Sequence, residues 1–531
     1  MESTNEKKGS VVDVEQRSID MEHGIKPSLH ERHLQMIAIA GMIGTGLFLG
    51  SGSAIARAGP VGALLSYVVM GLVTAAVSYT SGEMSAFMPV TGGFTRHAAR
   101  MVEPACGAAT GWNFWYSMAI TAPAEITAAS GLIEFWDSSV SPAVWISIFL
   151  VFILVVNFCG VRLYGESEVV FATLKIMLIV GIIIAGLVVD LGGGPDHDRR
   201  GFRNWQHPGP FNEYLTDGNT GKFLAWWSTL ISAAFSYGAI QVVAIAGAET
   251  NDPRRTIPKA TKRTFTRVIL FYVLSIFIAG LIIRSDDVRL QVSTGTASQS
   301  PFVIAFQESG IKALPSIINA IVITSALSSG SACVYLASRT LFGLSREGHA
   351  PKFFQHCNRF GVPVYAVGAT AIFLPLAYLV LGSSASVVFG WFVNITTVSG
   401  LIGWAVLEIS FLRMYYAFKA QGHSRDELPY KSPLQPYTAW FALVFVILVI
   451  LFSGFSVFFP GHFTASGFLT AYVNIPIFIV LYLGFKIMLK LKIYSTTEID
   501  IETELEIIAR EAHRYDEEPK SLPRRVLDKI F

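Results

Sequence analysis

The sequence lacks histidine in its apolar segments and cysteine in the loops that we expect to be external. All eleven histidines lie in polar tails or loops, so no apolar segment offers an imidazole to haem or to a metal ion. The cysteines Cys106, Cys159, Cys333 and Cys357 fall in apolar segments or in a loop that we expect to face the cytosol. An external disulfide framework is therefore excluded, an oxidoreductase or intramembrane metalloprotease is disfavoured, and we expect no metal, cofactor or catalytic residue.

The sequence also contains few charged residues. Charged residues make up 15% of the chain and hydrophobic residues 52%, with a mean hydropathy of +0.50, a composition foreign to soluble domains of this length. Largely uncharged windows of about 20 residues are long enough to cross a bilayer. They predict an all-α polytopic membrane protein with twelve transmembrane helices, at 34–57, 61–88, 104–135, 141–162, 168–190, 223–248, 264–284, 313–343, 364–382, 386–412, 438–460 and 468–489.

The placement of lysine and arginine predicts that both termini are cytoplasmic. The segment 1–33 is polar and charged, so we expect a cytoplasmic tail without a cleavable signal peptide. The loop after the sixth span is strongly basic, whereas those after the third, ninth and eleventh contain no lysine or arginine. Because an even number of spans returns the chain to the side where it started, we expect residues 490–531 to form a second cytoplasmic tail. Residues 34–489 between the tails form one transmembrane domain. Two longer external loops disagree with this rule, through Arg199, Arg200, Arg203, Arg289 and Lys312.

Glycine interrupts the first apolar segment. The run GMIGTGLFLGSG at 41–52 contains five glycines, each of which weakens a helix by about 1 kcal/mol relative to alanine. Unwound backbone persists in a membrane only where it is buried in protein or lines a cavity. The alternative is a face of small residues that lets two helices pack closely. A second break at Gly238, in the first span of a second five-span block, favours a 5+5 inverted repeat with its site at the bilayer midplane.

Two ionisable side chains enter the apolar segments deeply and are functional candidates. Glu125 stands midway along the third span, after Pro123 and between Thr121 and Thr127, and Lys175 lies about two turns into the fifth. The alternative for Lys175 is snorkelling to the membrane interface. The alternative for Glu125 is a neutral, hydrogen-bonded acid that only locks helices together.

Six sequence blocks are distinctive through their number and order. They are GMIGTGLFLGSG (41–52), PVTGGF (89–94), MVEPACGAATGWNFWYSMAITAPAEITAAS (101–130), FSYGAIQVVAIAGAETNDPRRTIP (235–258), SSGSACVYLASRTLFGLSREGHAPKFF (328–354) and KAQGHSRDELPYKSPLQPY (419–437). In these blocks the chain resembles the fungal amino acid permeases of the amino acid–polyamine–organocation superfamily, from His33 to about Tyr437. The resemblance implies proton-driven amino acid uptake on a LeuT-like 5+5 inverted-repeat core with two additional helices.

The resemblance also implies a substrate site at the two glycine-containing breaks. The residues that it assigns to the substrate are Ala40, Ile43, Gly44, Thr45 and Gly46 in the first span and Phe235, Ser236, Tyr237 and Gly238 in the sixth. Amides from Ile43 to Gly46 would hold the substrate carboxylate, and carbonyls of Ala40 and of the sixth-span group would take its ammonium. Lys175 matches a lysine that replaces the sodium ion of sodium-coupled relatives, and Glu125 is the second coupling candidate.

Two positions depart from the pattern of the resemblance. Relatives commonly carry glutamate where this chain has Gln241 in the sixth span, and asparagine where it has Ser331 in the eighth. The missing carboxylate removes a possible proton acceptor and a counter-ion for a cationic side chain. Gln241 and Ser331 remain candidates for substrate binding. We predict neutral L-amino acids, proline or a broad range of amino acids as substrates, and we disfavour basic amino acids.

These observations predict a proton-coupled secondary active transporter, not an enzyme, that imports amino acids across the plasma membrane by alternating access. We expect the amino acid and the proton as its partners and no nucleic acid, and the net charge of +2 is uninformative about partners. The alternative is a non-transporting amino acid sensor of the same fold, for which we would expect a long cytoplasmic extension. An ion channel would need a continuous ring of polar pore residues, which these spans do not supply.

The tails carry two smaller predictions. Lys7, Lys8 and Lys26 are candidate acceptors for the ubiquitination machinery, as the resemblance suggests. In the C-terminal tail, apolar residues at helical spacing predict a short amphipathic helix that regulates gating or trafficking or docks on the body, namely Ile501, Leu505, Ile508 and Ala512.

Overall fold

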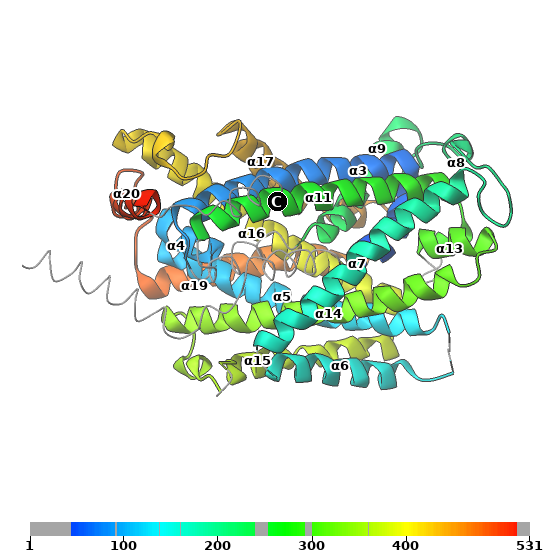
Figure 1. Cartoon of the computed structure of the whole chain (residues 1–531), viewed down its shortest axis with the longest axis horizontal. Coiled ribbons are helices and arrows are strands. Elements are labelled where there is room, and N and C mark those ends of the chain that lie inside the picture. Colours follow the sequence, from blue (N-terminus) through cyan, green and yellow to red (C-terminus); the bar gives the residue numbers. More distant parts are fainter. Residues whose placement is uncertain are drawn as a thin grey trace, which may run out of the picture.

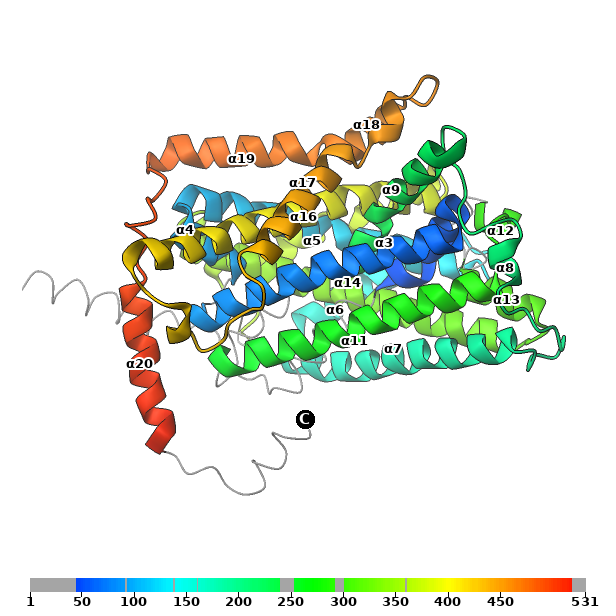
Figure 2. The same ribbon diagram turned by 90° about the horizontal axis from the view of Figure 1, so that it is seen from above.

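The computed structural model describes residues 44–90, 93–136, 139–159, 161–238, 253–291, 300–358 and 361–517. Over these ranges the secondary structure is helical, and β-structure is limited to two isolated bridges. Figures 1 and 2 show most of the long helices running side by side in one bundle, with shorter helices at its two ends.

Ten long helices build the described part of this bundle. They are α3 (Thr45–Phe87), α5 (Pro104–Ile133), α6 (Pro142–Phe158), α7 (Val161–Asp190), α9 (Gly218–Ser236), α11 (Pro253–Ile282), α14 (Leu314–Arg346), α16 (Ala385–Gln421), α17 (Tyr437–Phe452) and α19 (Asn474–Leu489). Shorter elements connect or flank them: α4 (Phe94–Met101), α8 (Arg203–Gln206), α12 (Val288–Gln291), α13 (Pro301–Glu308), η2 (Lys352–Gln355), α15 (Val364–Ala371), η3 (Leu374–Leu381), η4 (Arg425–Glu427), η5 (Phe455–Phe458), α18 (Ala465–Tyr472) and α20 (Glu502–Glu517).

The helices have the length and composition of a membrane protein. Within the described residues, five helical segments are long and apolar enough to cross a bilayer, or six if α18 and α19, bent by 42° at their junction, form one span. The all-helical membrane class predicted from hydropathy is confirmed. The count of twelve spans stays a prediction.

Helix α3 joins two of the expected spans through a kink. The hydropathy windows predicted a break between residues 57 and 61, and the structure confirms it: two helical segments meet at Gly59, whose backbone is not helical and has a φ of +76°. A side chain at Gly59 would lie 2.8 Å from the carbonyl oxygen of Pro210, so glycine is required both for the backbone conformation and for the approach of this loop. Pro60 follows directly, at the start of the second helical segment, where the missing N–H of proline costs no helical hydrogen bond.

The core forms where α3 and α5 pack against their neighbours. α3 packs against α9 and α11, while α5 packs against α14 and α16. The diagonal helix α7 contacts both α11 and α14, as Figure 1 shows. The largest fully buried side chains include Trp404 of α16, Tyr67 of α3, and Tyr237 and Tyr272 beside them.

The outer faces of the bundle are apolar. α7 exposes Val170, Met177 and Ile184, and α17 exposes Phe441 and Val444. Contiguous exposed apolar surface of this kind is a liability in water, whereas lipid acyl chains can cover it at no cost. The surface therefore supports the membrane assignment independently of helix length.

The predicted amphipathic helix near the C-terminus is present as α20. It lies at the same end of the bundle as α4, across the direction of the long helices (Figure 2). Glu504 points into the body and forms ion pairs with Arg100 of α4, at 2.8 Å, and with Arg254 of α11, at 3.4 Å. Ile501, just before the helix, is fully buried. Docking on the body, one of the two roles considered for this helix, is what the structure shows.

Candidate functional site

A cavity opens in the centre of the bundle between α3, α5, α9, α14 and α16. Its space amounts to about 900 Å³, including the part that is open to solvent. The lining includes Gly44 and Gly46 at the start of α3, Glu125 of α5, and Phe235, Ser236 and Gly238 at the end of α9. The structure thus brings together six residues that the sequence assigned to substrate binding or coupling.

The start of α3 and the end of α9 face each other at this cavity. α3 begins at Thr45 without a side-chain cap, and the Thr45 amide faces the Glu125 carboxyl group. α9 ends at Ser236, and its last turn is closed by the Tyr237 amide, which donates to the Ala233 and Ala234 carbonyls, and by the Gly238 amide, which donates to the Phe235 carbonyl at 3.1 Å. A side chain at Gly46 would lie 2.9 Å from a ring carbon of Phe235 and 3.0 Å from Oγ of Ser236. Glycine at 46 therefore lets the two helix ends approach closely.

Such an arrangement of helix ends suits a zwitterion. The amides at a helix N-terminus carry a partial positive charge and attract a carboxylate, while carbonyls at a C-terminus attract a cation. Both charges of an α-amino acid sit on groups attached to one carbon, so opposed helix ends at close range can hold them together.

Glu125 is buried at the wall of the cavity. Its side chain is 2% exposed, and Oε1 accepts a hydrogen bond from the Ser329 hydroxyl at 3.1 Å. The Thr45 side chain and amide lie beside the same carboxyl group, although the Thr45 hydroxyl does not reach full hydrogen-bond geometry. A side chain at Gly44 would lie only 2.8 Å from Oε1 of Glu125. The glycine at 44 is what permits the carboxyl group to touch the start of α3.

Lys175 lies behind the cavity wall. Its side chain is 0% exposed, which does not fit a residue that snorkels to the membrane interface. Its ammonium interacts electrostatically with Glu125 and also with Glu168, seven residues earlier on α7. Glu168 is not among the candidates predicted from the sequence. The signal was available, because a spacing of seven residues is two helical turns and places both side chains on one face.

Further polar groups line the cavity that were not predicted from the sequence. Asn113 of α5 and Ser399 of α16 bind each other reciprocally: the Asn113 amide donates to the Ser399 carbonyl at 2.9 Å, and the Ser399 hydroxyl donates to Oδ1 of Asn113 at 2.9 Å. Trp404 and Thr397 of α16 also line the cavity. No short motif marks these residues, since they meet only through the packing of α16 on α5.

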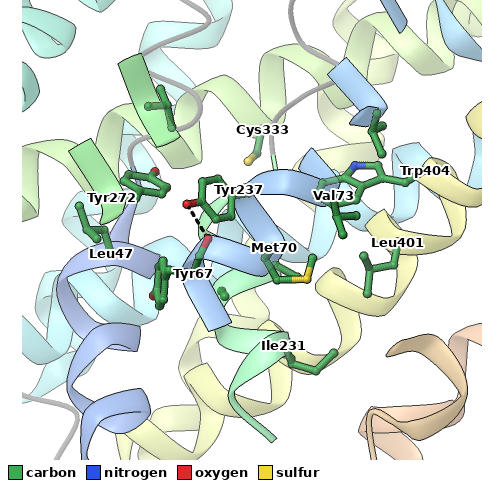
Figure 3. Close-up of a cluster of buried hydrophobic side chains, with 14 of the residues drawn as sticks. Leu47, Tyr67, Met70, Val73, Ile231, Tyr237, Tyr272, Cys333, Leu401 and Trp404 are labelled. Atoms are coloured by element: carbon green, nitrogen blue, oxygen red, sulfur yellow. Dashed lines mark hydrogen bonds between the residues drawn. The ribbon is translucent and has the colours of Figure 1, made fainter. Parts of the chain in front are cut away.

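Three predicted substrate residues are not among those that line the cavity, namely Ser331, Tyr237 and Thr45, which lies beside Glu125. The Ser331 hydroxyl accepts a hydrogen bond from the Asn157 amide of α6 at 3.1 Å, and Ser331 is not among the lining residues. Tyr237 is buried between Tyr67 and Tyr272, and its hydroxyl donates to the Tyr67 carbonyl at 3.1 Å, the dashed line in Figure 3. The remaining candidates, Ala40, Ile43 and Gln241, lie outside the described residues.

Metal ligation has no support in the part of the chain that the structure describes. No group of three His, Cys, Asp or Glu side chains there is arranged to hold an ion. The ionisable groups gathered behind the cavity are instead two carboxylates and one ammonium, all buried. A central cavity between opposed helix ends, set in an apolar bundle, defines the class of the protein as a membrane transporter.

Comparison with known proteins assigns the family. The sequence model described as "Amino acid permease" matches residues 33–497, so the chain belongs to the amino acid permease family. The family resemblance noted from the sequence blocks is confirmed, as is the prediction that the chain is a transporter and not an enzyme. The comparisons give no support to the alternative of a non-transporting sensor.

Curated relatives match over almost the whole chain. A proline-specific permease of Emericella nidulans is 43% identical, covering 95% of this chain and 92% of the relative. A lysine-specific permease of Saccharomyces cerevisiae is 39% identical, covering 94% and 81%. Among solved structures, a manganese transporter of Eremococcus coleocola superposes with a TM-score of 0.56 at 11% identity, covering 90% of this chain and 95% of that one. At 11% sequence identity this structural match supports a similar fold and nothing more.

Proposed function

We propose that this protein is a proton-coupled secondary active transporter that imports neutral L-amino acids, proline or a broad range of amino acids across the plasma membrane. The observation that carries the proposal is the central cavity, where the uncapped start of α3 faces the end of α9 and the Glu125 carboxyl group forms part of the wall. Alternating exposure of this cavity to the two sides of the membrane would move the substrate.

Substrate binding follows from the two helix ends. The first amides of α3, around Gly44, Thr45 and Gly46, hold the substrate carboxylate, and the carbonyls from Phe235 to Gly238 hold its ammonium. A small or apolar side chain would project toward the wall formed by Trp404 and Thr397. The name of the proline-specific relative supports this substrate class, although a lysine-specific relative is almost as similar.

Coupling to protons is assigned to Glu125 and Lys175. Glu125 lines the cavity and can exchange a proton with it, while Lys175 supplies a fixed positive charge at the place that a sodium ion would take in sodium-coupled proteins. One proton crossing a potential of 100 mV supplies about 2.3 kcal/mol, enough for between one and two decades of accumulation.

The proposed architecture has twelve spans arranged as a 5+5 inverted repeat with two additional helices. The start of α3 at Thr45 and the end of α9 at Ser236 support this proposal, because both helix ends fall within the glycine-containing segments that we assign to the first helix of each repeat. We place both tails in the cytosol, where Lys7, Lys8 and Lys26 are accessible to ubiquitination. The basic residues at the start of α11, which lie at the same end of the bundle as α20, support this orientation.

Uptake of labelled amino acid into cells that lack their own permeases tests the proposal. We expect accumulation that a protonophore abolishes and that replacement of sodium leaves unchanged. Competition by a panel of unlabelled amino acids identifies the substrate. Accumulation that survives the protonophore, or that needs sodium, would refute proton coupling.

A further inference from the structure

Lys175 has a second carboxylate neighbour that does not reach the cavity. Glu168 is 1% exposed, and its Oε2 accepts a hydrogen bond from the Ser328 hydroxyl of α14 at 2.9 Å. It interacts electrostatically with Lys175, as Glu125 does from α5. Only Glu125 of the two belongs to the cavity lining. The three ionisable groups therefore form a buried row with one end at the substrate cavity.

Adjacent serines of α14 hold the two carboxylates apart. Ser328 donates to Glu168, and Ser329 donates to Oε1 of Glu125 at 3.1 Å. Neighbouring residues of a helix point about 100° apart, so one short stretch of α14 can serve a carboxylate on α7 and another on α5. Each carboxylate has its own hydroxyl partner, and both share Lys175.

The charges of this row balance only when it holds one proton. With both carboxylates ionised, two negative charges face one ammonium and the buried cluster carries an excess negative charge. With one carboxylate neutral, the cluster has no net charge, which a low-dielectric interior strongly favours. If Glu125 were the only carboxylate beside Lys175, its protonation would leave a buried ammonium without a counter-ion. That state is strongly disfavoured.

We propose that Glu168 is the permanent counter-ion of Lys175 and a positioning residue for transport, because it keeps the ammonium paired while Glu125 gains and loses the transported proton. This inference rests on the proton-coupled function proposed above. Within the described residues, titratable groups that interact with the row include Cys333 of α14, which interacts with all three members, and Tyr272 of α11, which interacts with Glu125. Neither supplies a second cation.

The pH dependence of uptake tests this role directly. In Glu168→Gln, Glu125 becomes the remaining carboxylate partner of Lys175 and has to stay ionised. We expect the pH of half-maximal uptake to move toward acid by at least about one unit, a tenfold change in proton concentration. Surface amounts of each variant are measured alongside. A purely structural role for Glu168 would lower the surface amount and leave the pH of half-maximal uptake in place.

The two serines provide a matched pair whose expected shifts have opposite signs. Ser328→Ala removes the hydrogen bond that favours ionised Glu168, so Lys175 depends more on Glu125 and the profile moves toward acid. Ser329→Ala removes the bond that favours ionised Glu125, so its protonation becomes easier and the profile moves toward alkaline pH. Shifts of the same sign, or no shift in either variant, would overturn the proposal even if Glu168→Gln failed to reach the membrane.

A double-variant comparison shows whether Glu168 acts through Lys175. Residual amino acid exchange in Glu168→Gln/Lys175→Met should equal that of Lys175→Met within about twofold, because without the lysine the second carboxylate has nothing to hold. If the fold-loss of exchange activity in the double variant equals the product of the fold-losses in the two single variants, the inference is overturned. Proton coupling would be unaffected by that result. Wild-type uptake that ignores a protonophore would overturn both.

Discussion

At the scale of single residues, the absence of a side chain is as important as any functional group in this site. Gly44 and Gly46 let the start of α3 approach Glu125 on one side and Phe235 and Ser236 on the other. Their effect is one of distance, because a hydrogen bond weakens steeply once its donor and acceptor separate.

Gly44→Ala tests this close approach. The new methyl group would lie 2.8 Å from Oε1 of Glu125 and 3.3 Å from Oγ of Ser329, so the carboxyl group has to move while the fold is retained. We expect normal surface amounts and an apparent affinity for substrate reduced at least about tenfold. Gly50→Ala is the matched control, since its methyl group would find no atom closer than 3.9 Å. Equal uptake by both variants would show that the contact at Gly44 is dispensable.

Glu125→Gln separates a proton carrier from a helix lock. Glutamine keeps the size of the side chain and can still accept a hydrogen bond from Ser329, but it cannot titrate. We expect accumulation against a gradient to be lost, while exchange of labelled for unlabelled substrate persists. The measurement is uptake as a function of pH, with exchange assayed in parallel. A glutamine variant that accumulates substrate with the wild-type pH dependence would identify Glu125 as a helix lock.

At the scale of elements, α20 and α4 form the end of the bundle that we place in the cytosol. Glu504 of α20 joins Arg100 of α4 to Arg254 of α11, and Arg254 also donates to the carbonyls of Ala86 and Phe87 at the end of α3. One glutamate thus ties the C-terminal helix to three elements of the body, which explains why α20 is fixed in spite of its polar surface.

Glu504→Gln is expected to loosen α20. Losing hydrogen bonds to charged groups costs about 2 kcal/mol, which raises the population of the undocked helix about 30-fold. Limited proteolysis or hydrogen exchange over residues 490–517 measures the effect. Glu506→Gln is the matched control, because Glu506 on the same helix is 70% exposed and pairs only with Arg510 at 3.5 Å. Equal protection in the two variants would mean that Glu504 does not hold the helix.

We expect His97 in the short helix α4 to make the folded protein less stable as the pH falls. Burial lowers the pKa of His97 from 6.5 to about 4, although a hydrogen bond with the Met88 carbonyl opposes this shift. A histidine whose folded pKa is depressed contributes stability that is fully present above about pH 6.5 and is lost as the pH falls toward 4, up to about 3 kcal/mol.

Thermal unfolding of the purified protein between pH 7 and pH 4 measures this contribution. We expect His97→Gln to flatten the decline in stability over this interval, whereas substitution of the exposed His462 should not change it. Parallel declines in the wild type and in His97→Gln would show that His97 is not the group responsible.

At the scale of the whole molecule, selectivity depends on the charge balance of the cavity. Among the described lining residues, Glu125 is the only ionisable carboxyl group, and it already interacts with Lys175. A cationic substrate side chain would therefore lack a counter-ion of its own, and burying it unpaired is unfavourable.

We predict that a neutral aliphatic amino acid or proline inhibits uptake at least about tenfold better than arginine, and that Gln241→Glu narrows this difference by supplying a carboxylate in the sixth span. Competition against a labelled neutral substrate in both proteins measures it. Equal competition by arginine in the unmodified protein would refute the role of Gln241 and leave the family assignment unaffected.

Much of the fold could be predicted from the sequence because hydropathy is a local property. Each window of about 20 apolar residues needs a helix of that length to satisfy its backbone in lipid, whatever it packs against. The C-terminal helix could be predicted for the same reason, since the spacing of Ile501, Leu505 and Ile508 is written in the sequence. The position of the kink at Gly59 corresponds to the gap between the predicted spans 34–57 and 61–88.

The sequence by itself determined the membrane class, the approximate helix positions, the glycine-rich start of α3, and Glu125 and Lys175 as unusual intramembrane charges. Only the tertiary structure decided which of these meet. It joined Lys175 to Glu168 as well as to Glu125, turned Ser331 toward Asn157, and paired Asn113 with Ser399 beside the cavity. These contacts join residues on different helices, and the direction in which each helix faces its neighbours is set by packing over the whole bundle, which no local pattern records.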